Sequence, residues 1–536
     1  MSFPTSSVIA ERTIVLYNQH VVPRLTQRNK VIGISAAVAM SLFYMINKAL
    51  TPPKKLRHIR YVSILTILRS VLSGEPYWDR AYRIYKPIID DPNNHDGLYL
   101  EYNRAGWEVY ICNPDVAKEM LMNQGNFLCT TTTDIYPKLD IPEEAKNTLT
   151  DKFMGGPNIG FLNGHQWKTQ RKMANPAFHR SMPVRLFGEL TIEMFKVMET
   201  MGETINFSNL TERWTLDALG KAGFGFNFNA IQDQHSPWVR TYDICNVGIR
   251  DPFFFVFPKF DKKYLWLFPK RKLIHDELDR FVHMLQEVID TKRLSLKDKD
   301  YKNEALEENE KDLLTLLIES ENRGEGAMTD EELMSNLRFF FIAGHDTTSS
   351  ALSFAIHHLA QNPDIQQKAR EEAIDILGDE PVDVLPTLQE TKNMTYINQI
   401  ILETLRINGP LPTIVPRWTT KDTQLAGTFI PKDIPVNVNL FNIHHSEKLW
   451  KDSHVFNPDR FKGEENKSAF LAFGYGGRQC IGMNFSFNEQ RVMISMMLRK
   501  FTWSTPEKSI HKNGVITDGF IAFTPRNLDI NFKKRY

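Results

Sequence analysis

The stretch Phe473-Gly-Tyr-Gly-Gly-Arg-Gln-Cys480-Ile-Gly482 decides the fold of this sequence, because it sets a single cysteine beside an arginine in a loop dense in glycine. Glycine lacks a Cβ, so such a loop can turn tightly and bring backbone amides close to the sulfur, where hydrogen bonds stabilise a thiolate. A lone cysteine is most often a small buried hydrophobic residue. The glycines and the arginine around Cys480 instead favour a metal ligand.

A thiolate at Cys480 needs a cation, and two metals compete for that place. Zinc needs further cysteine or histidine ligands, but none stands at zinc-site spacing from Cys480 and no His-Glu-x-x-His motif occurs. The iron of a haem needs a single axial protein ligand here, and an axial thiolate favours cleavage of an O–O bond. The loop therefore predicts a haem-thiolate site.

With this loop the sequence resembles the cytochrome P-450 superfamily, whose haem-binding signature of Phe, Gly, Arg, Cys and Gly is matched in full. The matching residues are Phe473, Gly474, Arg478, Cys480 and Gly482. Three further signatures stand in the family's order, and a weaker one precedes them. They are Ala343-Gly-His-Asp-Thr-Thr348, Glu403-Thr-Leu-Arg406 and Pro458-Asp-Arg-Phe461, with Trp167 to Arg171 as the weaker match. The resemblance covers roughly residues 90 to 530.

The resemblance implies a mainly α fold with small β-sheets, in which the haem lies between two central helices. The spacing of apolar residues agrees, because it predicts long helices and only short strands. The predicted helices are 272–292, 329–361 and 393–407, and the strand-like pieces are 98–112 and those after Arg417. A charged run, 296–312, predicts a solvated loop between helices.

Residues 31–50 predict one N-terminal transmembrane helix. The first 16 residues of this segment, 31–46, carry no charge, and a span needs about 20 mostly apolar residues. Basic residues precede and follow the segment, and Pro52 and Pro53 then stop any helix. We therefore expect an N-terminal segment at 1–30, an anchor at 31–50, a proline-rich basic hinge at 51–60 and a catalytic domain at 61–536.

Two alternatives to the anchor stay open. The apolar segment could be a buried core helix, although core helices rarely carry basic residues at both ends. Residues 1–30 could also be a mitochondrial presequence, because they hold several basic residues and one acid, Glu11. We expect a single-pass protein of the endoplasmic reticulum membrane with a cytosolic catalytic domain, and a mitochondrial membrane as the alternative.

Composition limits the partners of the chain. The formal net charge is +1 over 536 residues, so no global field attracts nucleic acid, and we expect no nucleic-acid function. The four cysteines are too few and too far apart for a disulfide framework, which fits a reducing compartment.

Asp346 and Thr347 are the predicted catalytic residues. Without the resemblance, Gly344 in the middle of a predicted helix suggests close helix packing, and Thr347 could bond back to a backbone carbonyl. The resemblance instead implies a groove for dioxygen over the iron, where Asp346 and Thr347 deliver protons. It also implies that Glu403, Arg406 and Arg460 form a buried structural triad, whereas the spacing of the first two alone suggests an ordinary surface ion pair.

The predicted haem ligand set is larger than the cysteine. Haem carries two propionates, and the planar fork of arginine suits a carboxylate. The expected cofactor-binding residues are Trp167, Arg171, Arg417, Phe473, Arg478, Cys480 and Gly482, with Cys480 as the metal ligand. For the first two of these, a core indole and a solvated arginine remain the alternative.

The resemblance implies a monooxygenase that hydroxylates a lipophilic small molecule with O2 at haem b. No nucleotide-binding glycine fingerprint occurs, so electrons must come from a separate NADPH-dependent flavoprotein reductase, and Lys168 and Lys172 could lie on its docking face. Rearrangement of a hydroperoxide without O2, and a non-enzymatic haem carrier, are the alternatives. The substrate could be a steroid, fatty acid, terpenoid or xenobiotic.

Four residues are predicted to line the substrate pocket, namely Phe340, Ala343, Ile414 and Phe520. A further aromatic segment, 252–269, has two interpretations. It is either a loop that packs on the core, or a loop that dips into membrane lipid and gates an apolar pocket.

Overall fold

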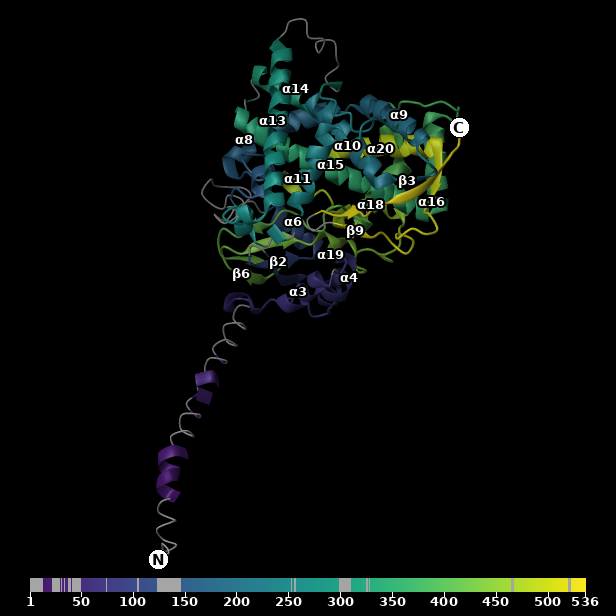
Figure 1. Cartoon of the computed structure of the whole chain (residues 1–536). Coiled ribbons are helices and arrows are strands. Elements are labelled where there is room, and N and C mark those ends of the chain that lie inside the picture. The colour runs from purple at the N-terminus through teal and green to yellow at the C-terminus, as the bar shows by residue number, and fades with distance from the viewer. Residues whose placement is uncertain are drawn as a thin grey trace, which may run out of the picture.

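A helix of 32 residues, α15 (Asp330–Gln361), runs through the middle of the computed structural model (Figure 1). It begins with a capping box, in which Thr329 and Glu332 satisfy each other's backbone amides. Three acidic residues in its first turn complement the positive end of the helix dipole. Its residues from Ser349 to Ala360 are all buried, because other helices pack around this part of α15.

The structure describes residues 13–21, 29, 31–32, 34–36, 40, 50–73, 75–103, 106–122, 146–251, 253–254, 257–297, 310–323, 326, 328–463, 467–518 and 522–536. The helices besides α15 are α3 (Ile64–Leu72), α4 (Tyr77–Arg80), α5 (Lys86–Ile89), α6 (Pro114–Met122), α7 (Leu149–Met154), α8 (Gly164–Arg180), α9 (Val184–Thr200), α10 (Phe207–Ala218), α11 (Pro237–Ile249), α13 (Pro269–Lys297), α14 (Leu313–Asn322), α16 (Pro363–Leu377), α17 (Leu388–Asn393), α18 (Thr395–Ile407), α19 (Leu440–His444) and α20 (Met483–Lys500).

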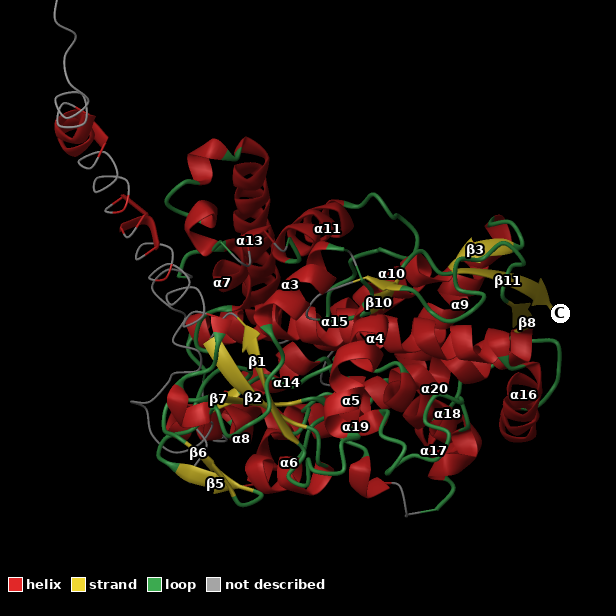
Figure 2. Cartoon of the chain, turned by 90° about the horizontal axis from the view of Figure 1, so that it is seen from below, coloured by secondary structure: helices red, strands yellow, loops and turns green. Residues whose placement is uncertain are grey.

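The strands form small sheets at the margins of this helical body, as Figure 2 shows. The largest has the order β1-β2-β7-β4, with β2 and β7 parallel and the other pairs antiparallel. The others have the orders β3-β11-β8, β5-β6 and β10-β9. The strands are β1 (Leu98–Asn103), β2 (Gly106–Ile111), β3 (Thr204–Asn206), β4 (Arg417–Trp418), β5 (Thr423–Leu425), β6 (Thr428–Ile430), β7 (Pro435–Val438), β8 (Phe501–Ser504), β9 (Thr517–Asp518), β10 (Thr524–Pro525) and β11 (Asp529–Lys534).

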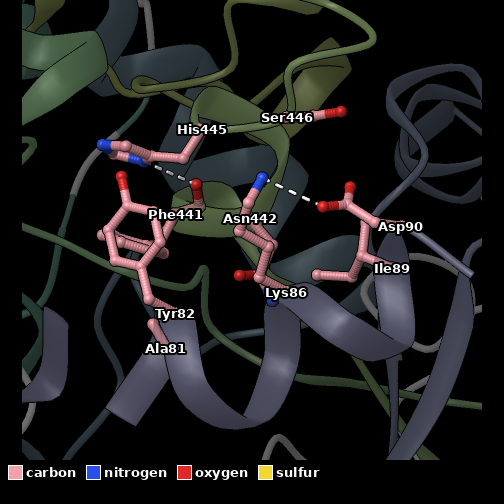
Figure 3. A pocket seen from close by; sticks show the side chains of 9 residues that line it. All are labelled: Ala81, Tyr82, Lys86, Ile89, Asp90, Phe441, Asn442, His445 and Ser446. Carbon is pink, nitrogen blue, oxygen red and sulfur yellow. Dashed lines mark hydrogen bonds and ion pairs between the residues drawn. The ribbon is translucent and has the colours of Figure 1, made fainter. Parts of the chain in front are cut away.

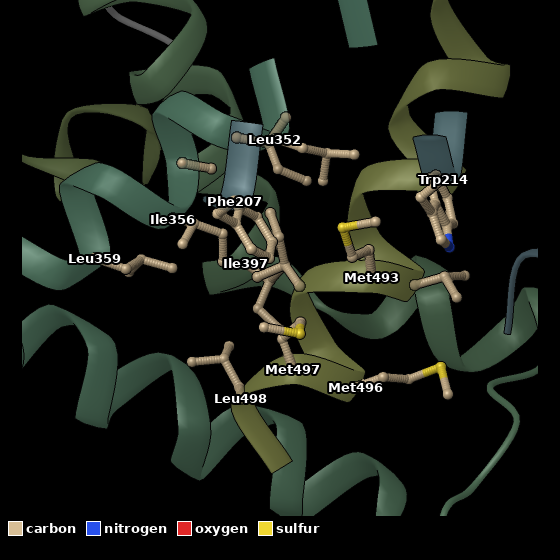
Figure 4. Packing of buried hydrophobic residues seen from close by; sticks show 14 of the residues in the cluster. Phe207, Trp214, Leu352, Ile356, Leu359, Ile397, Met493, Met496, Met497 and Leu498 are labelled. Carbon is tan, nitrogen blue, oxygen red and sulfur yellow. The ribbon is translucent and has the colours of Figure 1, made fainter. Parts of the chain in front are cut away.

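The largest hydrophobic cluster lies where α9, α10, α15, α16, α18 and α20 meet. Figure 4 shows its centre, where Met493 and Met497 of α20 face Leu352 and Ile356 of α15. Flexible methionine side chains fill irregular gaps between helices. This packing fixes α20, which follows Cys480 directly, against the helix that carries the predicted catalytic pair.

The mainly α fold with small sheets is confirmed. Two predicted helices correspond closely to α13 and α15. The predicted helix 393–407 corresponds to α18, which begins two residues later, at Thr395, and ends at Ile407 as predicted. Most of the predicted charged loop, 298–309, lies outside the described residues.

The predicted membrane anchor, 31–50, also lies largely outside the described residues. Within the described part of the chain, no helix has the length and apolar character needed to span a membrane. Four described apolar side chains of the segment, Val31, Ile32, Ile34 and Met40, are each more than half exposed, at 58, 54, 65 and 66%, whereas Leu50 is partly buried. These exposures argue against a buried core helix at these positions.

Candidate active site

The loop before α20 is folded around Cys480. Gly474 and Gly476 have φ angles of 72° and 71°, in the left-handed region that favours glycine. A Cβ on Gly476 would come within 3.0 Å of the Met122 sulfur, so α6 also requires glycine there. The Cys480 amide donates to the Phe473 carbonyl over 2.9 Å, which closes the loop. The predicted cysteine loop is thus a tight, internally bonded turn.

The Cys480 side chain is exposed, yet enough protein surrounds it that desolvation raises the pKa of its thiol. The backbone amide of Gly482 and the charge of Arg171 act in the opposite direction and favour the thiolate. The described residues contain no group of three or more His, Cys, Asp or Glu side chains that could hold a metal ion. Cys480 therefore suits a metal that takes one protein ligand, and the described chain offers no zinc-type cluster.

Helix α8 brings two of the predicted haem contacts to this loop. Arg171 Nη2 donates to the Gln479 carbonyl over 2.8 Å, and the Arg478 guanidinium lies over the Trp167 ring at 3.9 Å. The Trp167 Nε1 and the Arg171 Nε are buried and have no hydrogen-bond partner among the described residues. Buried donors without acceptors are costly, so both atoms indicate that an acceptor belongs at this place.

Arg417 comes from the large sheet, where it pairs with Val436 of β7. Its side chain is only 6% exposed, and within the described residues no carboxylate forms an ion pair with it. Buried arginines are normally paired with an anion. An accessible thiol and buried cationic donors on separate elements fit a haem, whose iron takes a thiolate and whose propionates take guanidinium and indole N–H groups.

The predicted triad residues lie together. Glu403 accepts from Arg406 Nε at 2.7 Å and Nη2 at 2.9 Å, and from Arg460 Nε at 3.2 Å. The Asn457 amide adds a fourth contact at 2.9 Å. Glu403 and Arg406 are 0% and 1% exposed, so this is a buried ion pair and the surface alternative is wrong. Arg406 Nη1 also donates to the His444 carbonyl over 2.6 Å, which ties α18 to α19.

The two predicted catalytic residues are neighbours on α15, but their side chains have different hydrogen-bond partners. The Thr347 hydroxyl donates back to the Ala343 carbonyl over 2.7 Å, the bond that the packing alternative describes. A Cβ on Gly344 would lie 3.3 Å from Leu219, so close helix packing is also present. Asp346, the residue before Thr347 on α15, is buried.

Asp346 is held by three donors. Its Oδ1 accepts from the Tyr242 hydroxyl at 2.9 Å and lies 2.8 Å from His345 Nδ1, and its Oδ2 accepts from Arg250 Nη2 at 2.7 Å. Burial raises the pKa of Asp346, but the bond and charge of His345, the charge of Arg250 and the Tyr242 hydroxyl outweigh it and lower this pKa to about 2. Asp346 is therefore ionised at neutral pH.

The predicted pocket residues are dispersed. Phe340 is 5% exposed and packs against Phe178 at 5.2 Å between ring centroids, within the core. Ala343 is exposed on α15, whereas Ile414 packs against the cluster at the large sheet. Phe520 lies outside the described residues. The described structure does not bring Phe340 and Ile414 together, and the pocket stays a prediction.

The described chain has a small hollow away from the cysteine loop and a larger one beside that loop. Figure 3 shows one of about 10 Å³ between α5 and α19, where Lys86 pairs with Asp90 at 2.9 Å and His445 Nδ1 donates to the Phe441 carbonyl at 2.8 Å. The other, of about 200 Å³, is lined by Leu402, Phe461, Lys467, Phe470, Phe473, Gly474, Gln479, Met483 and Phe487. Neither lining includes Asp346 or Thr347, so we assign neither to substrate.

The helical body and the one exposed cysteine among the described residues, which lies near the charge of Arg171, define the class of haem-thiolate enzymes. The family model described as Cytochrome P450 matches residues 108–532. Cytochrome P450 3A12 of Canis lupus familiaris is 29% identical over 395 residues, which cover 68% of this chain and 75% of that protein. Cytochrome P450 3A5 of Homo sapiens is 27% identical over 438 residues, covering 76% and 83%. Cytokinin hydroxylase of Arabidopsis thaliana is 28% identical over 405 residues, covering 72% and 75%.

The chain belongs to the cytochrome P450 family, which confirms the resemblance seen in the sequence. It is a cytochrome P450 monooxygenase, an oxidoreductase. Membership implies a haem cofactor, O2, and electrons from a redox partner.

Sequence reasoning missed the groups that hold Asp346. Arg250 and Tyr242 stand 96 and 104 residues before it in the chain, and no local pattern links them to α15. His345 was visible inside the Ala-Gly-His-Asp-Thr-Thr motif, and its place beside an acid was the one available signal.

Proposed function

We propose that this protein hydroxylates a lipophilic small molecule with O2, using haem b held by Cys480 and electrons from an NADPH-dependent flavoprotein reductase. The observation that carries the proposal is the geometry at Cys480, where an accessible sulfur faces the Gly482 amide and Arg171. When bound, the haem supplies the iron at which dioxygen is reduced and its O–O bond is cleaved.

The residues of this chain bind and orient that cofactor. Trp167, Arg171 and Arg417 would donate to the propionates, and Arg478 stacks on Trp167 to fix the indole. Glu403 and Arg406 hold the scaffold behind the cysteine loop without taking part in the reaction. Each donor in this set is buried or partly buried, so its contact with a propionate is not screened by solvent.

Asp346 and Thr347 would move protons on the oxygen side. Thr347 is partly exposed on the face of α15 that carries exposed Ala343, so its hydroxyl can turn from the Ala343 carbonyl toward a ligand. An ionised Asp346 must first receive a proton before it can deliver one. The acid and hydroxyl pair supports oxygen activation over hydroperoxide rearrangement.

Lys168 and Lys172 support a reductase docking face on α8. Both are exposed, whereas Trp167 is buried on the same helix. A reductase that meets this face would lie one helix away from the proposed haem contacts. Opposite charges on a partner steer its approach and fix its orientation.

We also place the protein at the endoplasmic reticulum membrane, with residues 31–50 as its anchor. The exposed apolar residues of that segment support this proposal. The aromatic segment adds to it, because Phe253, Phe257 and Trp266 are 41, 49 and 72% exposed beside lysines. Exposed aromatic side chains near basic residues suit a lipid headgroup region.

The test is turnover with defined components. Purified protein, NADPH and a flavoprotein reductase should oxidise a member of one substrate class among steroids, fatty acids, terpenoids and xenobiotics, and the product should contain one oxygen atom from ¹⁸O2. Each candidate is first screened for the change in haem absorption that substrate binding causes. Product that forms from a lipid hydroperoxide without NADPH or O2 would instead establish rearrangement.

A further inference from the structure

His345 uses both of its ring nitrogens inside the core. Nδ1 lies 2.8 Å from Asp346 Oδ1, and Nε2 lies 2.8 Å from the backbone carbonyl oxygen of Glu212 in α10. The residue is only 3% exposed. A carbonyl oxygen only accepts hydrogen bonds, and so does an ionised carboxylate. Both nitrogens must therefore carry hydrogen, which makes His345 an imidazolium.

The ionised state of Asp346 is supported by its other two donors. Arg250 and Tyr242 contact the same carboxylate, at 2.7 and 2.9 Å. Donors that converge on a buried carboxylate favour its charged form. The reverse effect acts on His345, where burial lowers the pKa but the bond to Asp346, its charge and Glu212 outweigh burial and raise it above the usual value.

The three donors differ in whether they can release a proton near neutral pH. Burial lowers the pKa of Arg250, but Asp346 outweighs burial and raises it above the already high value of a guanidinium. Burial, together with Asp346, raises the pKa of Tyr242 well above that of a free phenol. An unperturbed histidine has a pKa of about 6.5. Among these three donors, only His345 holds a proton that is transferable near neutrality.

We infer that His345 is a positioning residue of the proton-delivery network, which orients Asp346 through its Nδ1–H and passes that proton to it when oxygen is reduced. In this step the Nδ1–H bond breaks and an Oδ1–H bond forms, which leaves a neutral imidazole and a carboxylic acid. A neutral Asp346 is held less strongly by Arg250, so its side chain can turn toward Thr347 and give up the proton. The inference rests on the proposed role of Asp346.

The proton lost from His345 must be replaced, and titratable or charged groups on the neighbouring helices lie around it. They are Glu212 on α10 and Tyr242, Asp243 and Arg250 at α11. Burial raises the pKa of Glu212 to about 7, and burial also raises the pKa of Asp243. Glu212 is partly exposed and Asp243 is exposed. The Glu212 carboxyl, with its pKa near neutrality, can therefore relay protons from solvent toward the His345 ring.

The first test is the pH profile of coupling, measured as product formed per NADPH oxidised in the reconstituted holoenzyme. His345→Gln keeps an N–H donor for the Glu212 carbonyl but has no proton to release. Tyr242→Phe is the matched control, because it removes a different donor from the same oxygen of Asp346. Coupling of the wild type should fall as pH rises through the pKa of His345, since the imidazolium is depleted.

In Tyr242→Phe, coupling should still fall as pH rises, as in the wild type. His345→Gln should show coupling at least about tenfold lower at pH 6.5, more released hydrogen peroxide, and no fall with pH, consistent with the 10²–10⁴ range of general acid catalysis. A His345→Gln variant with the wild-type pH profile would overturn the inference. If Asp346→Asn uncouples the enzyme while His345→Gln retains that profile, the inference fails and the proposed role of Asp346 stands. If Asp346→Asn leaves coupling intact, both fail.

The second test does not depend on turnover. In ¹⁵N-histidine-labelled holoenzyme, kept diamagnetic by reduction and carbon monoxide, both nitrogens of His345 should give protonated-nitrogen shifts at pH 6.5, identified by their loss in His345→Gln. His358, on the same helix and bonded to Asn408 at 2.7 Å, is the internal control, because burial lowers its pKa to about 4 and it should remain neutral. A neutral tautomer at His345 at pH 6.5 would refute the inference whatever the coupling of the variant.

Discussion

Glu403→Gln should lower the free energy of unfolding by about 3 to 5 kcal/mol, the range for removing one partner of a buried ion pair. Oε2 of Glu403 accepts from Arg406 Nε, whereas Oε1 accepts from Arg406 Nη2, Arg460 Nε and the Asn457 amide. The glutamine amide oxygen can replace Oε1, but its NH2 group would face Arg406 Nε. One charge-assisted bond, worth about 1.5 to 3 kcal/mol, is lost, and the Arg406 charge loses its buried counter-ion.

The assay is urea unfolding of the holoenzyme, followed by tryptophan fluorescence and by haem absorption. The matched control is Asp459→Asn beside Arg460, which breaks the Lys368–Asp459 pair of 3.0 Å in which both side chains are about half exposed. Exposed pairs contribute about 0 to 1 kcal/mol, so this variant should unfold almost like the wild type. Equal small losses in both variants would refute the buried-triad reasoning.

The remaining predictions concern oxygen activation, the anchor and the haem contacts. Thr347→Ala should keep haem content but lower product per NADPH and raise hydrogen peroxide, because one proton-delivering hydroxyl is lost; full coupling would make Thr347 only a helix residue. Deletion of residues 1–50 should weaken membrane attachment in cell fractionation without loss of haem. The segment 252–269 should still retain part of the truncated protein on membranes. Loss of haem from the truncated protein would contradict a separate anchor. Arg171→Gln should speed haem transfer to apomyoglobin about tenfold or more, as expected for about 1.5 to 3 kcal/mol from a lost charged hydrogen bond; an unchanged rate would remove Arg171 from the propionate contacts.

The sequence predicted those features that local chemistry determines. Thr329 and Glu332 mark the start of α15, because a capping box is a local signal. The same kind of signal, Thr387 with Glu390, starts α17, a short helix that the spacing of apolar residues did not predict. The glycines of the cysteine loop required a tight turn, and the structure has them at positive φ around Cys480.

Features that depend on contacts between residues far apart in the chain could not be predicted from the sequence. Helical spacing does not say which face of a helix meets a pocket, and Phe340 packs into the core beside Phe178. Two of the three contacts of Asp346 come from Tyr242 on α11 and Arg250 just after it, about 100 residues earlier, so only the folded chain brings them together. The sequence could assign Asp346 a role but not its charge state, which these contacts determine.

Carbon monoxide binding to the reduced protein tests the central claim most directly, because the Soret band of the complex depends on the axial ligand. The intact chain should give the strongly red-shifted band of thiolate ligation. Cys480→Ala should lose that band, since alanine offers no ligand and the other described cysteines, Cys112 and Cys245, are buried elsewhere. A band typical of histidine ligation in the properly folded wild type, or an unchanged band in Cys480→Ala, would contradict the assignment of Cys480 as the iron ligand.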